Sequence, residues 1–169
     1  MKISVSDYSF SKLYKSGAMT QIDCIKKAKE LGFDAIEFTD LNPNDGQSKL
    51  EFAAALKAES EKIGLPIIAY LFGADFLKND DEITRVKGQI DVAEALGVKM
   101  ARHDATYGSD KPFDLVVEKL ANACREVTEY AKSKGIKTMI ENHGLYCQDS
   151  LRVEKLYCKV NHENFGLLV

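Results

Sequence analysis

The chain has 169 residues, 45% of them hydrophobic, which suffices for one domain with a buried core over residues 1–169. The net charge of −3 and the isoelectric point near 5.7 argue against a nucleic-acid partner, because such proteins normally present a basic face. The longest apolar run, residues 66–73, is too short to cross a bilayer and the N-terminus lacks a signal-peptide segment, so we expect a cytoplasmic protein with no membrane partner.

One pattern recurs along the chain: an amphipathic helix ends in a glycine, and an apolar strand follows within a few residues. The helix-ending glycines are Gly32, Gly64, Gly97 and Gly135. Each stands where the end of a helix needs a left-handed backbone, which glycine adopts at low cost. After a first strand near the N-terminus, the pattern therefore predicts strands at residues 35–38, 66–70, 98–101 and 136–141.

Capping signals predict where the helices between these strands begin. Thr20-x-x-Asp23 and Ser48-x-x-Glu51 are capping boxes, and Pro112 suits the first position of a helix. Apolar residues at helical spacing follow each start and also cover residues 83–97. A fifth helix is expected over residues 150–160, and an apolar sixth strand over residues 165–169.

Strict alternation of strands and helices predicts an α/β fold with parallel strands. An open doubly wound sheet would carry a glycine-rich phosphate turn after the first strand, and residues 7–11 contain no glycine. A TIM (β/α)8 barrel needs eight units in about 250 residues. We therefore predict an incomplete TIM-type barrel with about six parallel strands and five intervening helices.

Polar residues gather at the carboxyl ends of the predicted strands, where a barrel carries its functional site. The fourth strand ends in Arg102-His103-Asp104 and the fifth in Glu141-Asn142-His143. Strand alternation puts Glu141 and His143 on one side of the sheet. A carboxylate and an imidazole that converge there can bind a divalent metal or transfer a proton.

Structural roles remain open for several of these residues. Glu37, inside an apolar strand, must be paired or functional, because an unpaired buried carboxylate is unfavourable. His103 fits a salt-bridge cluster with Arg102 and Asp104 as well as it fits a functional site. The cysteines lack metal-ligand spacing, so we expect free thiols in or near the core: Cys24, Cys124, Cys147 and Cys158.

Residues 140–144 (Ile-Glu-Asn-His-Gly) and 164–169 (Asn-Phe-Gly-Leu-Leu-Val) resemble the xylose-isomerase-like sugar phosphate isomerase/epimerase family of TIM barrels. Residues 32–37 are similar to that family's second strand. The resemblance covers the whole chain and about two-thirds of a family barrel. It implies a metal-dependent isomerase or epimerase that acts on a sugar or sugar phosphate by moving a proton at a carbon next to a carbonyl.

The resemblance also implies a metal site. In this family a glutamate, an aspartate, a histidine and a second glutamate, on the fifth to eighth strands, hold Mn, Mg, Co or Zn. Only the first ligand carries over, as Glu141, and the aspartate would be expected just beyond Val169. We therefore expect the chain by itself to bind metal weakly or not at all and to show little or no isomerase activity.

The remaining site residues are assigned by the same resemblance. Glu141 and His143 are expected to be catalytic, and the substrate-binding residues are expected to be Glu37, Arg102, His103 and Asn142.

Two other functions remain open. One is a lyase or dehydratase that acts on a polyol or glycoside with the same fold and metal. The other is a partial barrel without activity that pairs with another chain through the open edges of its first and sixth strands, since exposed edges invite β-pairing. The expected partners are thus a small sugar or sugar phosphate and a second copy of the chain.

Overall fold

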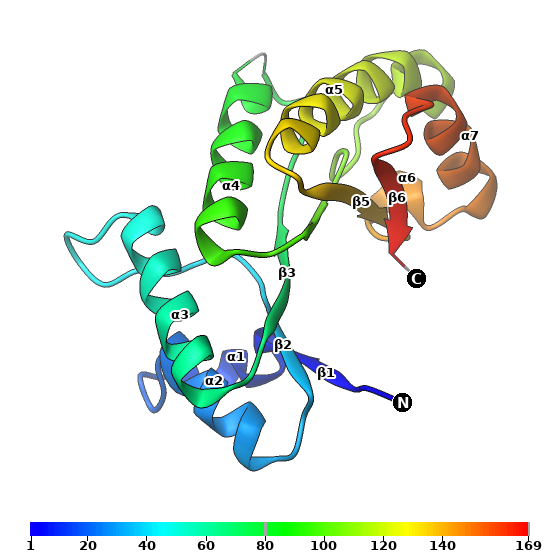
Figure 1. Cartoon of the computed structure of the whole chain (residues 1–169). Helices are drawn as coiled ribbons and strands as arrows, with labels where there is room; N and C mark the ends of the chain where they lie inside the picture. Colours follow the sequence, from blue (N-terminus) through cyan, green and yellow to red (C-terminus); the bar gives the residue numbers. More distant parts are fainter. Residues whose placement is uncertain (80, 169) are drawn as a thin grey trace. The chain divides into compact units, whose positions relative to one another are not determined.

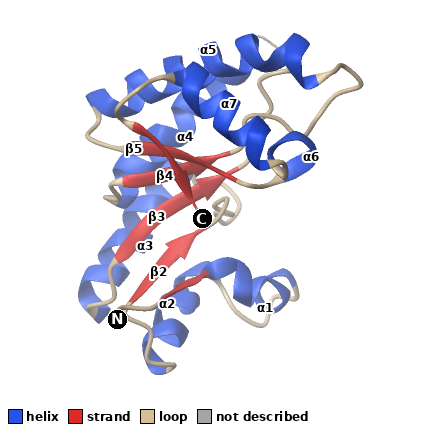
Figure 2. Cartoon of the chain, turned by 90° about the vertical axis from the view of Figure 1, so that its right-hand side faces the viewer, coloured by secondary structure: helices blue, strands red, loops and turns tan. Residues whose placement is uncertain are grey.

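The computed structural model describes residues 1–79 and 81–168, and these residues form strands that alternate with helices, drawn in red and blue in Figure 2. The chain divides into two compact units. Unit 1 comprises residues 1–71 and 91–99, and unit 2 comprises residues 72–90 and the part from residue 100 onward. The alternation confirms the predicted α/β fold class.

Unit 1 contains three strands that pair in parallel, β1 with β2 and β2 with β3. Val5 lies opposite Ile36 and Phe38 opposite Tyr70, with an irregular register between Ile36 and Glu37. Its elements, with the last turns of α4, are β1 (Ser4–Ser6), the 3-10 helix η1 (Asp7–Phe10), α1 (Ser11–Lys15), α2 (Gln21–Glu30), β2 (Ala35–Phe38), α3 (Lys49–Ile63) and β3 (Ile67–Phe72).

Both predicted capping boxes are present in unit 1. The Thr20 hydroxyl accepts a hydrogen bond from the Asp23 backbone N–H at 3.1 Å, and the Asp23 carboxylate accepts one from the Thr20 N–H at 3.0 Å. Ser48 and Glu51 make the same reciprocal pair at the start of α3. These bonds satisfy N–H groups that the first turn of a helix leaves without partners.

The core of unit 1 lies between its helices and strands. Its fully buried side chains include Ile25, Ile36, Phe38, Leu56 and Tyr70. Burial of each contributes about 2 kcal/mol relative to exposure. Ile25 and Leu56 lie on the apolar faces predicted for α2 and α3, and the other three residues lie on β2 and β3.

Unit 2 also contains three strands that pair in parallel, β4 with β5 and β5 with β6. Arg102 lies opposite Met139, and Glu141 opposite Leu168. The elements, coloured from green to red in Figure 1, are α4 (Glu82–Leu96, in its first turns), β4 (Met100–His103), α5 (Phe113–Ser133), β5 (Lys137–Glu141), α6 (Gly144–Cys147), α7 (Ser150–Val160) and β6 (Phe165–Leu168).

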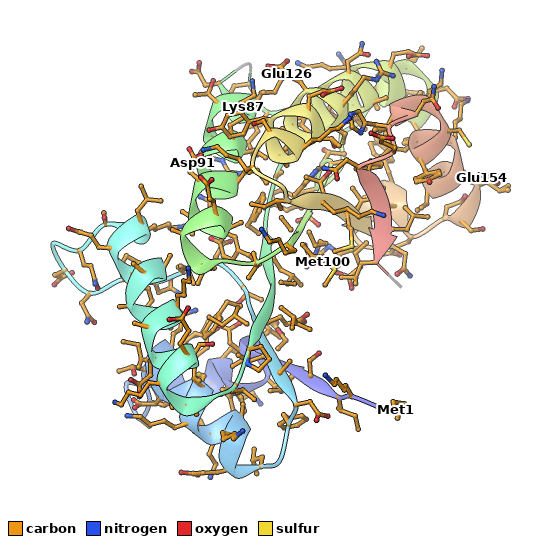
Figure 3. All side chains as sticks on the ribbon, viewed as in Figure 1. Met1, Lys87, Asp91, Met100, Glu126 and Glu154 are labelled. Carbon is orange, nitrogen blue, oxygen red and sulfur yellow. The ribbon has the colours of Figure 1, made fainter. Side chains whose placement is uncertain are left out.

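Helices α5 and α7 lie side by side in Figures 1 and 2, and charged groups connect them. Lys155 pairs with Asp114 at 2.7 Å. The Arg125 guanidinium donates to the backbone carbonyl oxygens of Lys159 and Val160 and thereby caps the C-terminus of α7. Figure 3 shows another such pair within unit 2, Lys87 of α4 with Glu126 of α5, at 2.7 Å.

Several predicted boundaries are wrong by one or two residues. Strand β4 begins at Met100 rather than residue 98, because the Val98 N–H donates to the Ala93 carbonyl and closes the end of α4. Helix α5 begins at Phe113, and Pro112 is its N-cap rather than its first residue. Strand β3 continues to Phe72. The predicted strand residue Val169 lies outside the described residues.

The glycines that end the helices have the predicted left-handed backbone. The φ angles of Gly32, Gly64, Gly97 and Gly135 are 85°, 68°, 78° and 69°. The short helices α1 and α6 lie in segments that the apolar spacing did not predict as helical.

All four cysteines are free, as predicted, and Cys24, Cys124 and Cys147 are buried. Burial raises the pKa of the Cys24 thiol to about 12, which makes it a poor nucleophile at neutral pH. Cys158 is exposed on α7, so its expected place in or near the core is wrong. Among residues 1–79 and 81–168, no helix has the length and apolar character needed to cross a membrane.

Candidate functional site

Four polar side chains meet in unit 2 where β4 and β5 end, and we call them the Arg102 cluster: Arg102, Asp104, Glu141 and His143. Arg102 lies opposite Met139 in the parallel register of β4 and β5. Because side chains alternate along a strand, Arg102 and Asp104 extend to one side of β4, and Met139, Glu141 and His143 extend to one side of β5. The register therefore brings the two polar pairs together.

The cluster is a chain of alternating charges. The Arg102 Nη1 donates to Asp104 Oδ1 at 3.1 Å. The Arg102 Nε lies 3.1 Å from Glu141 Oε2, an ion-pair distance without the alignment of a hydrogen bond. The His143 Nδ1 lies 3.4 Å from Asp104 Oδ1. Glu141 thus contacts Arg102, and His143 contacts Asp104, at the two ends of the Arg102–Asp104 ion pair.

Burial divides the cluster into a covered centre and accessible ends. The side chains of Asp104 and Arg102 are 10% and 15% exposed, and those of Glu141 and His143 are 36% and 60% exposed. The two residues predicted to be catalytic are therefore the ones that a small molecule can reach.

The covered position of Asp104 changes its acidity. Burial raises the pKa of this carboxyl group, while the charges of Arg102 and His143 act in the opposite direction and that of Glu141 raises it further. The net direction is upward.

His103 follows Arg102 and faces the other side of β4. It is fully buried among aromatic rings, stacked on Phe72 at 6.1 Å between centroids and edge-on to Phe76 at 5.8 Å. Its Nδ1 lies 2.8 Å from the Asp104 carbonyl oxygen, which can only accept, so Nδ1 carries the hydrogen. Burial lowers the pKa of His103 to about 4, so the ring is neutral at pH 7.

The His103 Nε2 is buried and has no hydrogen-bond partner among the described residues. The contacts of His103 are those of a core residue, which matches neither a salt-bridge cluster nor an exposed binding group. Its assignment to substrate binding stays a prediction.

The other two predicted residues are Glu37 and Asn142. Glu37 is half-buried on β2 and belongs to unit 1, whereas the Arg102 cluster belongs to unit 2. Asn142 is exposed in the bend between β5 and α6.

A second polar group, in unit 1, was only partly visible in the sequence. Buried Asp7 accepts hydrogen bonds from the Thr39 N–H and hydroxyl, both at 2.8 Å, and from the Gln21 Nε2 at 2.7 Å. Burial raises the pKa of Asp7, and these hydrogen bonds partly offset the shift. The sequence shows Asp7 and Thr39 at strand ends, but Gln21 follows a capping residue and carries no signal of its own.

The loops next to the Arg102 cluster are joined by Tyr146. Its hydroxyl is hydrogen-bonded to the Ser109 carbonyl at 3.0 Å, to the Ser109 hydroxyl at 2.8 Å, and to the Lys111 carbonyl. Gly108, in the loop after β4, packs closely against Leu145 of α6, because a Cβ at position 108 would lie 2.8 Å from the Leu145 side chain. The loop after β4 and helix α6 after β5 therefore form one connected rim.

The described donors do not fit a metal site by themselves. No group of three or more His, Cys, Asp or Glu side chains that could hold a metal ion occurs in the described part of the chain. The Arg102 guanidinium lies beside the one predicted ligand, Glu141, and a cation there opposes the approach of a second one.

Solved structures share the fold at low sequence identity. The probable 3-DHS dehydratase involved in petrobactin synthesis, from Bacillus anthracis, has a TM-score of 0.75 at 19% identity over 99% of this chain and 62% of that chain. An L-ribulose 3-epimerase has a TM-score of 0.75 at 18% identity, over 99% and 60%. A D-psicose 3-epimerase has a TM-score of 0.75 at 16% identity, over 99% and 62%.

The chain thus spans 60 to 62% of the length of these structures, and the similarity shows the fold. A comparison of the sequence with curated proteins gives no match. The family model described as a xylose isomerase-like TIM barrel matches residues 25–169, most of the chain. The chain belongs to the xylose isomerase-like TIM-barrel family.

Proposed function

We propose that the chain provides part of the active site of a sugar isomerase or epimerase, in which Glu141 moves a proton at a carbon next to a carbonyl. The observation that supports this most is the Arg102 cluster, which holds an accessible carboxylate at the end of a barrel strand. Barrel enzymes place their reacting groups at this end of the strands.

Glu141 has the geometry of a positioned base. Its Oε2 lies 3.1 Å from the Arg102 Nε, which fixes one side of the carboxylate, and the side chain is exposed enough to meet a substrate. A carboxylate held in place can take the proton from the carbon and return it to the neighbouring carbon on the same face, while the proton of the adjacent hydroxyl group passes to the former carbonyl oxygen, which gives the isomer. Proton transfer by a positioned group accelerates such a step about 10²–10⁴-fold.

His143 is proposed as the second catalytic group. It is the most exposed member of the cluster, and its imidazole can exchange a hydrogen bond or a proton with a substrate oxygen. We propose that Arg102 and Asn142 bind the sugar, and the substrate-binding assignments of buried His103 and of Glu37 stay predictions. We propose a small sugar or sugar phosphate as substrate, and the names of the two epimerase structures support the sugar. We also propose a cytoplasmic location.

The family's divalent metal stays a prediction for Glu141. The described donors do not form a metal site by themselves, so further ligands would be needed to hold a metal at Glu141. A metal ligated by Glu141 would have to compete with Arg102 for the same carboxylate.

A dehydratase is the second candidate. Elimination needs a base that removes a carbon-bound proton and an acid that protonates the departing hydroxyl group, which leaves as water. Glu141 and His143 lie on one Arg102–Asp104 pair and could supply these two roles. The 3-DHS dehydratase among the similar structures supports this alternative.

We further propose that the chain self-associates through a strand edge. Strand β6 pairs with β5, and Leu167 on it is exposed. An exposed strand edge recruits another strand. Light scattering after size-exclusion chromatography tests this: a dimer or larger species is expected, and a monomer at high micromolar concentration would contradict it.

Solvent-exchange NMR tests the catalytic proposal. The chain is incubated in D2O with a panel of ketoses and ketose phosphates, and deuterium at the carbon next to the carbonyl is measured. Slow exchange, in keeping with the little isomerase activity expected of this chain, is expected for at least one sugar and is expected to be lost in Glu141→Gln. Glu154→Gln, an exposed glutamate of α7 labelled in Figure 3, is the matched control and should retain exchange.

The products separate the two candidates. An isomer or epimer supports the first, and an unsaturated product that has lost water supports the dehydratase. Equal exchange in the wild type and in Glu141→Gln would remove Glu141 from the mechanism.

A further inference from the structure

Asp104 is the most buried member of the Arg102 cluster, and one of its oxygens contacts two other members. Its Oδ1 accepts from the Arg102 Nη1 at 3.1 Å and lies 3.4 Å from the His143 Nδ1. The charged groups that face it are Arg102 from β4 and Glu141 and His143 from β5 and the residues that follow. Asp104 therefore connects residues from two strands through one atom.

The contact with Arg102 controls how Arg102 meets Glu141. A guanidinium is a planar, rigid fork, so a bond at Nη1 also determines where Nε points. Here Nη1 donates to Asp104 Oδ1 and Nε lies beside Glu141 Oε2, each at 3.1 Å. Without Asp104, the Arg102 side chain regains rotational freedom and Glu141 loses a fixed partner.

The contact with His143 controls the orientation of an otherwise exposed ring. A carboxylate accepts hydrogen bonds, so the ring nitrogen that faces it, Nδ1, carries the hydrogen. The Nε2 is then the unprotonated nitrogen of the neutral ring, on the side away from Asp104. The His143 N–H also donates to the Glu141 carbonyl oxygen at 2.7 Å, which ties the backbone of the two residues together.

We propose that Asp104 is a positioning residue, which through a single oxygen holds Arg102 against Glu141 and sets the tautomer of His143. The proposal rests on the proposed function, because it concerns the residues assigned to proton transfer. Asp104 itself does not touch the substrate. Its effect on the reaction passes through Arg102 and His143.

Nitrogen-15 NMR of the histidine rings at one fixed pH near 8 tests this without any substrate. The chain has three histidines, so His143→Gln assigns the His143 signals. In the wild type, the His143 ring is expected to carry its hydrogen mainly on Nδ1. In Asp104→Ala, the hydrogen is expected to move mainly to Nε2. Asp110→Asn, an exposed aspartate nearby in sequence, should leave the His143 pattern unchanged.

His162 reports folding in the same spectrum, because its Nε2 pairs with Glu129 at 2.8 Å and its Nδ1 accepts from the Asn164 N–H at 3.0 Å. If Asp104→Ala loses the native His162 pattern, Asp104→Asn takes its place and is expected to lower the Nδ1–H population of His143. An unchanged His143 tautomer with a native His162 signal would overturn the proposal. Absent deuterium exchange in the wild type would instead contradict the proposed function, so the two failures are distinguishable.

Discussion

Buried His103 is expected to make the chain sensitive to mild acid. The pKa of His103 is about 4 in the folded chain, whereas it has the ordinary histidine value of 6.5 in the unfolded chain. Between pH 6.5 and pH 4, His103 is therefore protonated in the unfolded chain but neutral in the folded chain. The free energy of unfolding thus falls as the pH falls through this window and is highest above it.

The size of this effect follows from the pKa difference. Each pKa unit corresponds to about 1.4 kcal/mol, so the full loss across the window is about 3 kcal/mol. At pH 5 about 2 kcal/mol of it is already lost relative to pH 7.5. Solvent does not screen the charge of this ring, because the ring is fully buried among Phe72, Phe76 and Phe165.

Urea unfolding at pH 7.5 and pH 5 measures this loss. His103→Gln is the comparison variant, because glutamine can donate a hydrogen bond to the Asp104 carbonyl but cannot ionise. Other titrating groups affect both proteins alike, so the wild type should lose about 2 kcal/mol more than the variant between the two pH values. Equal losses in the two proteins would refute the burial of a neutral His103.

The remaining predictions concern stability. Arg125→Met removes two hydrogen bonds to the C-terminus of α7 and should lower the free energy of unfolding by about 1–3 kcal/mol. Urea unfolding measures this loss, and an unchanged free energy would show that α7 does not depend on this cap. Gly73→Ala should be destabilising by about 1 kcal/mol, because a Cβ there would overlap the hydroxyl end of the exposed Tyr107 side chain, which has to move aside. Gly88→Ala should stabilise the folded chain by up to about 1 kcal/mol, because Gly88 lies within α4 and a Cβ there meets no other atom. Thermal unfolding of the two glycine variants compares them, and a lower midpoint for Gly88→Ala than for Gly73→Ala would contradict the placement of Tyr107.

Features that depend on neighbouring residues could be predicted from the sequence. The capping boxes at Thr20 and Ser48, the left-handed Gly64 and helix α7 all rest on signals within a few residues, and the structure confirms them. The parallel alternation of strands and helices follows from the same local patterns. The start of β4 was predicted two residues early, because the apolar Val98 completes a helix end instead of a strand.

Features that depend on distant residues could not be predicted in the same way. The sequence shows Asp104 next to His103 but not that β4 and β5 pair in the register that brings Asp104 to His143. Likewise, His103 looks like a polar residue at a strand end, and its burial depends on Phe72, Phe76 and Phe165, which come from other elements. The sequence therefore identifies the residues at the strand ends but not which of them are covered.

The claim that Glu141 transfers the proton is tested most directly by one ratio of rates. For a ketose that shows exchange, the rate of deuterium incorporation next to the carbonyl is measured for Glu141→Gln and for Glu154→Gln at the same pH and protein concentration. We predict a rate at least about 100-fold lower for Glu141→Gln, as for the loss of a positioned acid–base group. Equal rates for the two variants would contradict the role of Glu141.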